Sequence, residues 1–175
     1  MGNKEQEVEY LLKWAPETCN LALDLGCGET KIADWFTGVD RTRGETARVN
    51  GTTFKCNPDV LCDIDNLPYE NGTVDYIVSS HSLEHVTNPI ETLNYWVEKL
   101  RVGGRIGIIV PDWRYTWSCE NDDSRYNPDG HKHDFTPPEL ERVIKSIRLC
   151  ENIKILDLSK PTTDWSIGAA IERVV

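Results

Sequence analysis

Apolar positions along the chain gather in short runs that alternate with helical patterns. Apolar or β-rich runs lie at 21–25, near 37–40, and at 59–62, 74–80, 105–110, 152–158 and 165–173, and we expect seven strands there. Strands that alternate with helices are typical of a mostly parallel sheet with helices on both faces. We therefore predict a doubly wound α/β fold, in which ligands bind at the carboxyl ends of the strands.

Helices are expected where apolar spacing follows a period of 3.6 residues. Apolar residues recur at this spacing from Val8 to Ala15, which predicts a covering helix within residues 1–16 that ends before Pro16. Asn88-Pro89 and Thr136-Pro137 are typical helix starts, and each has a glutamate where a capping box needs one. The apolar stripes that follow these two starts indicate core packing.

The stretch Leu21 to Glu29 reads LALDLGCGE and predicts a strand, a tight turn and the start of a helix. Gly26 and Gly28 lack the Cβ atoms that would keep a ligand away from the backbone. A dinucleotide fingerprint would need a third glycine at the position of Lys31, so that class of site is disfavoured. The turn is compatible with another nucleotide-like cofactor, or with a purely steric role for the glycines.

Length and charge narrow the class of protein. The 175 residues are expected to form a single domain, and the net charge of −10 gives no support to nonspecific binding of nucleic acid. No apolar run has the length of a signal peptide core or a membrane span, and none of the six cysteines forms a C-x-x-C pair. We expect a cytoplasmic protein with free thiols, without nucleic-acid partners or membrane insertion.

Polar residues stand at the ends of the next predicted strands. Asp40 can accept two hydrogen bonds from a ribose diol, or it can be a solvated turn acid. Asp63 can accept a hydrogen bond from an adenine amino group while Ile64 packs on the ring. Ser80 and His81 end the fourth predicted strand, below the expected cofactor position.

Three motifs together resemble a known family. They are LDLGCG, the segment DVLCDIDNLPYENGTVDYIVSSHSLEHV, and LRVGGRIGIIVPD. In order and spacing they are similar to the class I S-adenosylmethionine-dependent methyltransferases, especially the small methyltransferase-11-like group with its D-x-x-x-LP-[FY], S-x-LEH and LxPGG stretches. The resemblance runs from about residue 20 to 150. It implies a Rossmann-like fold, S-adenosylmethionine as methyl donor and S-adenosylhomocysteine as product.

The resemblance also implies roles for single residues. Asp24, Gly26 and Gly28 would surround the methionine portion of the cofactor, Asp40 would hold the ribose hydroxyls, Asp63 and Ile64 would bracket the adenine, and Ser80 with His81 would line the floor near the sulfonium. Residues 41–58 match the family pattern poorly, so we expect a short or irregular helix between the second and third strands.

The long irregular stretch 111–135 is the expected substrate region, because loops of this length in compact domains are often lids or binding loops. Trp113, Tyr115 and Trp117 alternate in it, so a strand there would present all three on one face. They would form a platform for the substrate, or the apolar seam of a lid. Arg114 and Arg125 could bind an anionic group, although solvated charges are the default interpretation.

Histidines at the end of this stretch are the candidates for acid–base chemistry. An oxygen or nitrogen nucleophile often has to lose a proton, and His131 or His133 could take it as general base. Either could instead cap the following helix or hold the loop. No second ligand cluster accompanies His131, His133 and Asp134, so no metal site is expected, and Glu84 with His85 is expected to hold local structure.

These observations favour a methyltransferase that moves a methyl group from S-adenosylmethionine to an oxygen or nitrogen atom of an unidentified small-molecule acceptor. The alternative is a non-catalytic S-adenosylmethionine-binding subunit or regulator that needs a partner. A nucleotide-dependent oxidoreductase is disfavoured by Lys31.

Overall fold

A seven-stranded sheet forms the centre of the molecule in the computed structural model, which describes residues 2–47, 53–116, 130–159 and 165–175. In spatial order the strands are β5 (Val60–Leu61), β2 (Thr37–Asp40), β1 (Ala22–Leu25), β6 (Val74–Ser80), β7 (Leu100–Pro111), β9 (Ser166–Arg173) and β8 (Ile153–Ser159). The first five are parallel, while β9 runs antiparallel to both β7 and β8. All seven predicted strands are present, and β7 starts earlier than predicted.

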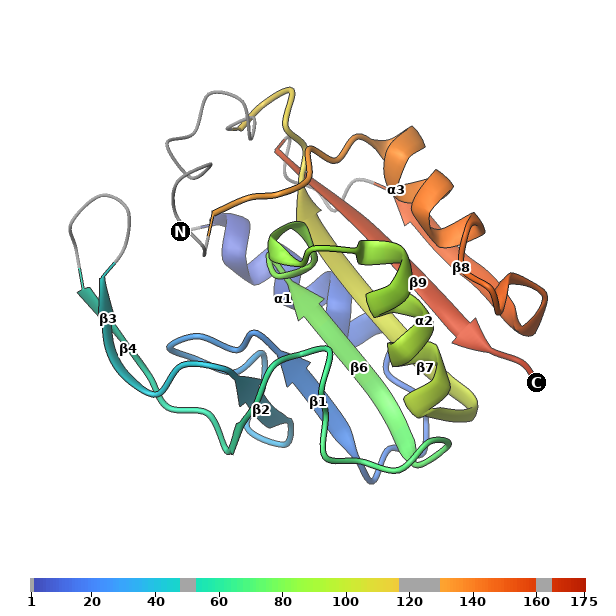
Figure 1. Cartoon of the computed structure of the whole chain (residues 1–175), viewed down its shortest axis with the longest axis horizontal. Coiled ribbons are helices and arrows are strands. Elements are labelled where there is room, and N and C mark those ends of the chain that lie inside the picture. Colours follow the sequence, from blue (N-terminus) through green and yellow to red (C-terminus); the bar gives the residue numbers. More distant parts are fainter. Residues whose placement is uncertain (1, 48–52, 117–129, 160–164) are drawn as a thin grey trace.

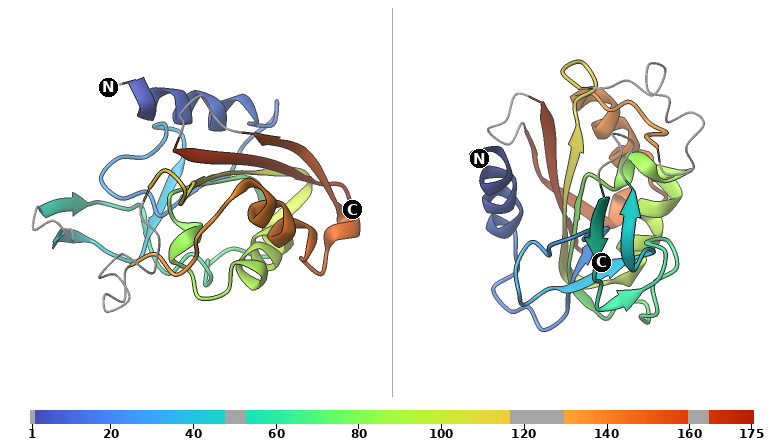
Figure 2. Two further views of the ribbon diagram at one scale, coloured as in Figure 1. Left: turned by 90° about the horizontal axis from the view of Figure 1, so that it is seen from above. Right: turned by 90° about the vertical axis from the view of Figure 1, so that its left-hand side faces the viewer.

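Helices cover both faces of the sheet, as predicted. Helix α1 (Gly2–Lys13) lies on one face, and η1 (Leu83–His85), α2 (Pro89–Lys99) and α3 (Pro137–Lys145) lie on the other, as the view from above shows (Figures 1 and 2). A further short helical turn, η3 (Cys150–Asn152), precedes β8. No helix in the described ranges is long and apolar enough to cross a membrane.

Alternation along the strands builds two apolar cores. Tyr76 and Val78 of β6 pack with Leu11 of α1, whereas Ile77 between them packs with Trp96 of α2. All four of the apolar residues from β6 and α1 are fully buried, as is Trp96. Because successive side chains of a strand point to opposite faces, the two helical layers are held by different residues of the same strands.

The predicted start signals of α2 and α3 form as expected. The Asn88 side chain accepts a hydrogen bond from the Glu91 backbone N–H at 3.3 Å. The Glu139 carboxylate accepts bonds from the backbone N–H and the hydroxyl of Thr136, both at 3.1 Å. Such caps stabilise a helix by about 1 kcal/mol each and fix where the chain enters it. Both caps directly follow segments that carry candidate site residues.

The helix expected directly after Gly28 is absent from the structure, so this prediction is wrong. Residues 26–36 form turns and bends. The Asp24 carboxylate accepts a hydrogen bond from the Ile32 backbone N–H at 2.7 Å, and Lys31 Nζ lies 2.9 Å from Asp59 Oδ2. These contacts hold residues 26–36 across the end of β1. The Ile32 N–H is bonded to the Asp24 side chain, whereas in a helix it would bond to a backbone carbonyl of the same helix.

A β-hairpin replaces the short or irregular helix expected between the second and third strands. Strands β3 (Gly44–Ala47) and β4 (Thr53–Cys56) pair antiparallel, with Gly44 opposite Cys56, and are separate from the main sheet. The hairpin projects beyond β2 at one side of the molecule (Figure 1). Phe54 and two threonines give these segments the composition of strands rather than of a helix.

Helix α1 depends on a glycine in β9. A Cβ atom on Gly168 would lie 2.5 Å from ring carbons of Tyr10, whose hydroxyl donates a hydrogen bond to Asp157 at 2.7 Å. Gly168→Ala should therefore push α1 off the sheet and lower the free energy of unfolding by about 1–3 kcal/mol in urea titrations. In a Tyr10→Ala background the same substitution should cost much less. An equal cost in both backgrounds would contradict this explanation.

Candidate functional site

The predicted cofactor residues meet at one edge of the sheet, because the strands that carry them are parallel. Leu25 pairs with Val39 and with Ser79, so the ends of β1, β2 and β6 are in register. Asp40 is the last residue of β2, and Ser80 is the last residue of β6. Loops from three neighbouring strands thus enclose one region at the carboxyl edge.

The glycine turn after β1 is tied to the end of β2. The backbone N–H groups of Gly26 and Cys27 both donate to the carbonyl of Val39, at 2.8 and 3.2 Å. Gly26 and Gly28 have φ angles of +74° and +57°, which favour glycine. A Cβ on Gly26 would overlap the Ser82 hydroxyl, whereas a Cβ on Gly28 would meet no atom within 4 Å. Packing requires the first glycine, and the second faces open space where its Cβ would stand.

Asp40 holds a fixed orientation next to this turn. Its Oδ2 accepts a hydrogen bond from the Gly28 N–H at 3.1 Å, and its Oδ1 accepts one from the Thr42 N–H at 2.9 Å. A carboxylate has about four acceptor positions, so two bonds leave capacity on both oxygens. The geometry suits an acceptor for two neighbouring hydroxyl groups.

Asp24 is a buried carboxylate below the same turn. Only 3% of the residue is exposed, and burial raises the pKa of its carboxyl group to about 6. The hydrogen bond from Ile32 and the charges of Lys31 and Lys4 oppose this shift. A buried carboxyl group with a raised pKa favours a cationic ligand, because a nearby positive charge would keep the group ionised.

The loop after β5 adds a further wall. The Cys62 N–H donates to the Asp40 carbonyl at 3.1 Å, so the loop starts beside the end of β2. Asp63 is exposed, and Ile64 is half-buried against the core. The Ile64 carbonyl accepts a hydrogen bond from Trp96 Nε1 at 2.8 Å. Helix α2 thereby fixes both predicted adenine contacts relative to Asp40.

His81 has a backbone conformation that is rare for its residue type. Its φ angle is +54°, and such a residue costs of order 1–3 kcal/mol, so it persists only where its surroundings impose it. The ring stacks on Trp165 at 5.0 Å, and its Nε2 lies 3.3 Å from Glu7 Oε1. Burial alone would lower the pKa of His81, but the Glu7 bond and the charge of Glu84 outweigh it and raise the pKa. Glu7 of α1 and Trp165, directly before β9, therefore fix this part of the site.

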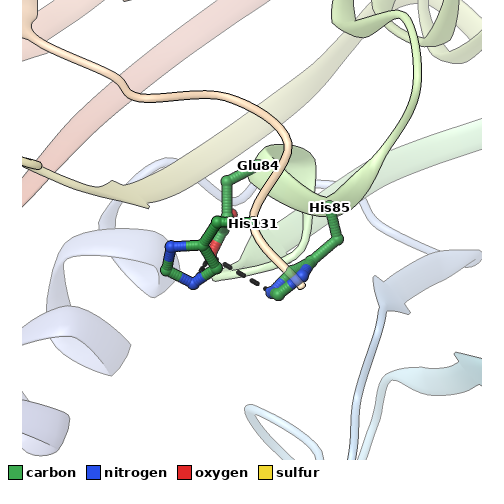
Figure 3. A group of neighbouring side chains, drawn as sticks. All are labelled: Glu84, His85 and His131. Carbon is green, nitrogen blue, oxygen red and sulfur yellow. Dashed lines mark ion pairs between the residues drawn. The ribbon is translucent and has the colours of Figure 1, made fainter. Parts of the chain in front are cut away.

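Glu84, His85 and His131 form a cluster beside His81. Turn η1 contributes the first two residues, and His131 comes from the segment that leads to α3. Glu84 Oε1 lies 3.7 Å from His85 Nε2 and 4.0 Å from His131 Nε2, as the dashed lines in Figure 3 mark. The two imidazole rings meet edge to face, with centroids 4.9 Å apart. Residues about 46 positions apart in the chain thus share one small space.

Two side chains of this cluster have strongly shifted pKa values. Only 1% of Glu84 is exposed, and burial raises the pKa of its carboxyl group to about 7. Burial, together with the neighbouring His131, lowers the pKa of His85 to about 4. Both carboxylate oxygens of Glu84 and Nδ1 of His85 are buried without a hydrogen-bond partner among the described residues. Buried polar groups nearly always have partners, so this cluster calls for an explanation.

Sequence reasoning missed this cluster, because it assigned Glu84 and His85 to local structure. The available signal was the SLEH stretch directly past the end of a buried strand, which is where ligand-binding residues gather in such sheets. The proximity of His131 depends on tertiary structure and leaves no local pattern.

His133 contacts the backbone of the segment after η1, which is the geometry of one of the alternatives considered for it, a hydrogen bond to the loop. Its Nε2 lies 3.0 Å from the Val86 carbonyl and 3.3 Å from that of Thr87. Because carbonyl oxygens only accept hydrogen bonds, Nε2 carries the proton. A pocket of about 370 Å³ opens beside His133, between the starts of α2 and α3. None of the predicted cofactor residues lines it.

Trp113 and Tyr115 lie in a turn after β7, so at these two residues the chain does not have the strand geometry that would present them on one face. Residues 113–115 make a turn in which the Tyr115 N–H donates to the Asp112 carbonyl at 2.9 Å. Trp113 and Tyr115 are nevertheless 40% and 59% exposed. The guanidinium of Arg114 donates two hydrogen bonds, of 2.8 and 2.6 Å, to the buried Asp112 carboxylate. Trp117 and Arg125 lie outside the described residues.

Comparison with known sequences supports the resemblance. A family model described as a methyltransferase domain matches residues 23–108. A demethylmenaquinone methyltransferase of Protochlamydia amoebophila is 23% identical over 136 residues, which is 66% of this chain and 56% of that protein. An uncharacterised 37.1 kDa protein of a Streptomyces fradiae transposon is 32% identical over 104 residues, or 53% of this chain and 30% of that protein. The chain thus spans about a third to a half of the length of these relatives.

Solved structures share the fold at low sequence identity. Geranyl diphosphate C-methyltransferase from Streptomyces coelicolor, solved with Mg²⁺, geranyl diphosphate and S-adenosylhomocysteine, is 15% identical with a TM-score of 0.69, covering 97% of this chain and 77% of its own. The 1,6-didemethyltoxoflavin N1-methyltransferase of Burkholderia thailandensis is 14% identical with a TM-score of 0.69, covering 99% and 79%. A complex of the Haloferax volcanii Trm112 activator with a methyltransferase matches with a TM-score of 0.64 and 14% identity, covering 97% and 90%.

The family match, the strand order and the glycine turn lead to the same assignment. The model match includes the turn after β1, the acid that ends β2 and the SLEH stretch after β6. The matching family model, over residues 23–108, and the solved structures that share the fold are those of class I S-adenosylmethionine-dependent methyltransferases.

Proposed function

We propose that this chain transfers a methyl group from S-adenosylmethionine to an oxygen or nitrogen atom of a small-molecule acceptor and releases S-adenosylhomocysteine. The observation that carries the proposal is the hydrogen bond between the Gly28 N–H and the Asp40 carboxylate at 3.1 Å. It joins the glycine turn to a carboxylate that can accept bonds from a diol, and the family match covers both residues. Relatives of the same fold were solved with S-adenosylhomocysteine.

Each wall of the proposed cofactor site has a specific role. Asp24, Gly26 and Gly28 hold the methionine portion, Asp40 binds the ribose hydroxyls, Asp63 and Ile64 contact the adenine, and Ser80 with His81 forms the floor below the sulfonium. The buried charge of Asp24 supports the first assignment, because the methionine portion carries an ammonium group.

Methyl transfer requires alignment of the nucleophile with the methyl group more than it requires strong acid–base catalysis. S-adenosylmethionine supplies a methyl group on a sulfonium, which is a good leaving group. The protein has to hold the nucleophile in line with that methyl group and exclude water. Of the two candidate histidines, we propose His131 as the one that acts on the acceptor, because His133 Nε2 contacts the Val86 carbonyl.

We assign the acceptor to the region of residues 111–135, within a single domain that comprises residues 1–175. The exposed side chains of Trp113 and Tyr115 support this assignment, and Trp117 follows them in the sequence. The five cysteines that the structure describes are free thiols, which favours a reducing, cytoplasmic setting.

A second candidate is a non-catalytic S-adenosylmethionine-binding subunit that depends on a partner. The fold it shares with a methyltransferase solved together with the Trm112 activator favours this alternative. Donor binding without turnover on any acceptor, together with an obligate partner in affinity purification, would distinguish it from the enzyme.

Calorimetry with the purified chain tests the cofactor class. S-adenosylhomocysteine and S-adenosylmethionine should both bind at one site per chain, and NADH should not, because Lys31 stands where a dinucleotide site needs glycine. The proposal would be overturned if the chain bound NADH but neither S-adenosylmethionine nor S-adenosylhomocysteine. A metabolite pool screened for release of S-adenosylhomocysteine would then identify the acceptor.

Asp40→Ala should weaken the binding of S-adenosylhomocysteine by about 10- to 100-fold, since hydrogen bonds to a charged acceptor contribute about 1.5–3 kcal/mol. Isothermal titration measures the loss. Asp65→Ala removes an exposed carboxylate from the neighbouring loop and should leave the affinity unchanged. Equal affinities of all three proteins would rule out the ribose role of Asp40.

Asp24→Asn should change stability in a pH-dependent manner. The folded protein holds the Asp24 proton more tightly than the unfolded chain, because burial raises the carboxyl pKa to about 6. Ionisation therefore costs stability as the pH rises from about 4 to 6. The asparagine avoids this cost, so the variant should be more stable than the wild type by about 1–3 kcal/mol at pH 8 and equal to it below pH 4. Its affinity for the cationic donor should fall. A variant less stable at pH 8 would contradict the buried-charge argument.

A further inference from the structure

We propose that Glu84, His85 and His131 form a binding site for one divalent transition-metal ion, of which Zn²⁺ is the representative. Each residue offers one ligand atom, and these atoms all lie within 4.8 Å of one another. Two imidazoles and one carboxylate are a donor set that suits such ions.

The distances between the ligand atoms are slightly longer than those of a metal-bound site. Glu84 Oε1 lies 3.7 Å from His85 Nε2 and 4.0 Å from His131 Nε2. Metal–ligand bonds of about 2.1 Å at tetrahedral angles place ligand atoms about 3.4 Å apart. The required shift is small for His85 and larger for His131, and rotation of the two imidazoles can supply it, because both rings are directed toward the same carboxylate oxygen, as the dashed lines in Figure 3 mark.

Burial of the carboxylate is the independent observation that points to a cation. Glu84 is 1% exposed, and neither of its carboxylate oxygens has a hydrogen-bond partner in the parts of the chain that the structure describes. Nδ1 of His85 is in the same condition. A buried carboxylate without hydrogen bonds is costly, and coordination of a metal ion is one of the few ways to offset that cost.

Backbone hydrogen bonds hold the two ligand segments together. The Glu84 carbonyl accepts bonds from the N–H groups of Lys132 and His133, at 2.8 and 3.2 Å. His131 is thereby held next to η1 by residues that directly follow it. A site on such fixed backbone needs little ordering when the ion binds.

The position of the cluster connects the ion to methyl transfer, a step that rests on the proposed function. His81 Nδ1 lies 3.8 Å from Glu84 Oε1, so the ion would bind next to the floor of the cofactor site. Three protein ligands leave coordination positions open. An acceptor hydroxyl that takes one becomes more acidic and gives its proton to water, so His131 acts on the acceptor as a metal ligand and not as a general base. Its oxygen then bonds to the methyl carbon while the methyl–sulfur bond breaks and sulfur keeps the electron pair. The inferred substrate class is therefore an alcohol, enol or phenol that can chelate a metal.

Metal titration of the full chain tests the site directly. Protein treated with EDTA and then dialysed should bind one Zn²⁺ per chain in calorimetry, and one Co²⁺ with visible absorption typical of nitrogen and oxygen ligands. Glu84→Gln and His131→Ala should each weaken binding at least tenfold. His133→Ala is the matched control from the same loop and should keep the wild-type affinity, because its Nε2 contacts backbone carbonyls.

Folding and metal binding can be separated in these variants. Glu84→Gln removes a buried charge, so its melting temperature without metal should not fall below that of the wild type. Absence of stoichiometric binding by the folded wild type would overturn the proposal. So would undiminished binding by both Glu84→Gln and His131→Ala, which would point to the cysteine thiols.

Titration of S-adenosylhomocysteine in the same preparations distinguishes the two proposals. Loss of metal binding with intact S-adenosylhomocysteine binding would overturn the metal site alone. Metal binding without any affinity for S-adenosylhomocysteine would instead overturn the proposed function and keep the metal site.

Discussion

The bond between the glycine turn of β1 and the carboxylate at the end of β2 is the constraint on which the rest of the site depends. Gly26 and Cys27 donate to the Val39 carbonyl, and Gly28 donates to Asp40. These bonds hold the carboxyl ends of β1 and β2 side by side. The loop after β5 then takes its position from the Asp40 carbonyl, through the Cys62 N–H. One short network of backbone bonds thus sets the distances between three walls.

Two buried carboxylates indicate where this fold gives up stability for function. Asp24 and Glu84 are 3% and 1% exposed, and burial raises the pKa of both. Buried charges oppose folding, and here one carboxylate lies in β1 and the other follows the neighbouring strand β6. A cationic ligand at each position would offset the cost. The same physical argument therefore supports the methionine end of the donor site and the metal site.

The parts that the sequence could predict are those determined by local pattern. Runs such as 74–80 gave the strands, and Asn88 and Thr136 gave the helix starts, because capping depends on residues three positions apart. The connection 26–36 could not be predicted, since it depends on a bond from Ile32 back to Asp24. The hairpin of β3 and β4 was not predicted, because the sequence matches the family pattern poorly in that segment. The approach of His131 to Glu84 depends on the whole fold.

This division explains why the donor is easier to assign than the acceptor. The proposed donor contacts come from backbone groups and acids at strand ends, which the topology itself places, so they are expected wherever the fold occurs. The proposed acceptor contacts come from side chains of η1, through the proposed metal site, and of the segment before α3, which topology leaves free to vary. Proteins of this fold accordingly include a C-methyltransferase and an N-methyltransferase. In this chain the acceptor side carries a buried carboxylate between two imidazoles, and that local chemistry, rather than the fold, has to select the substrate.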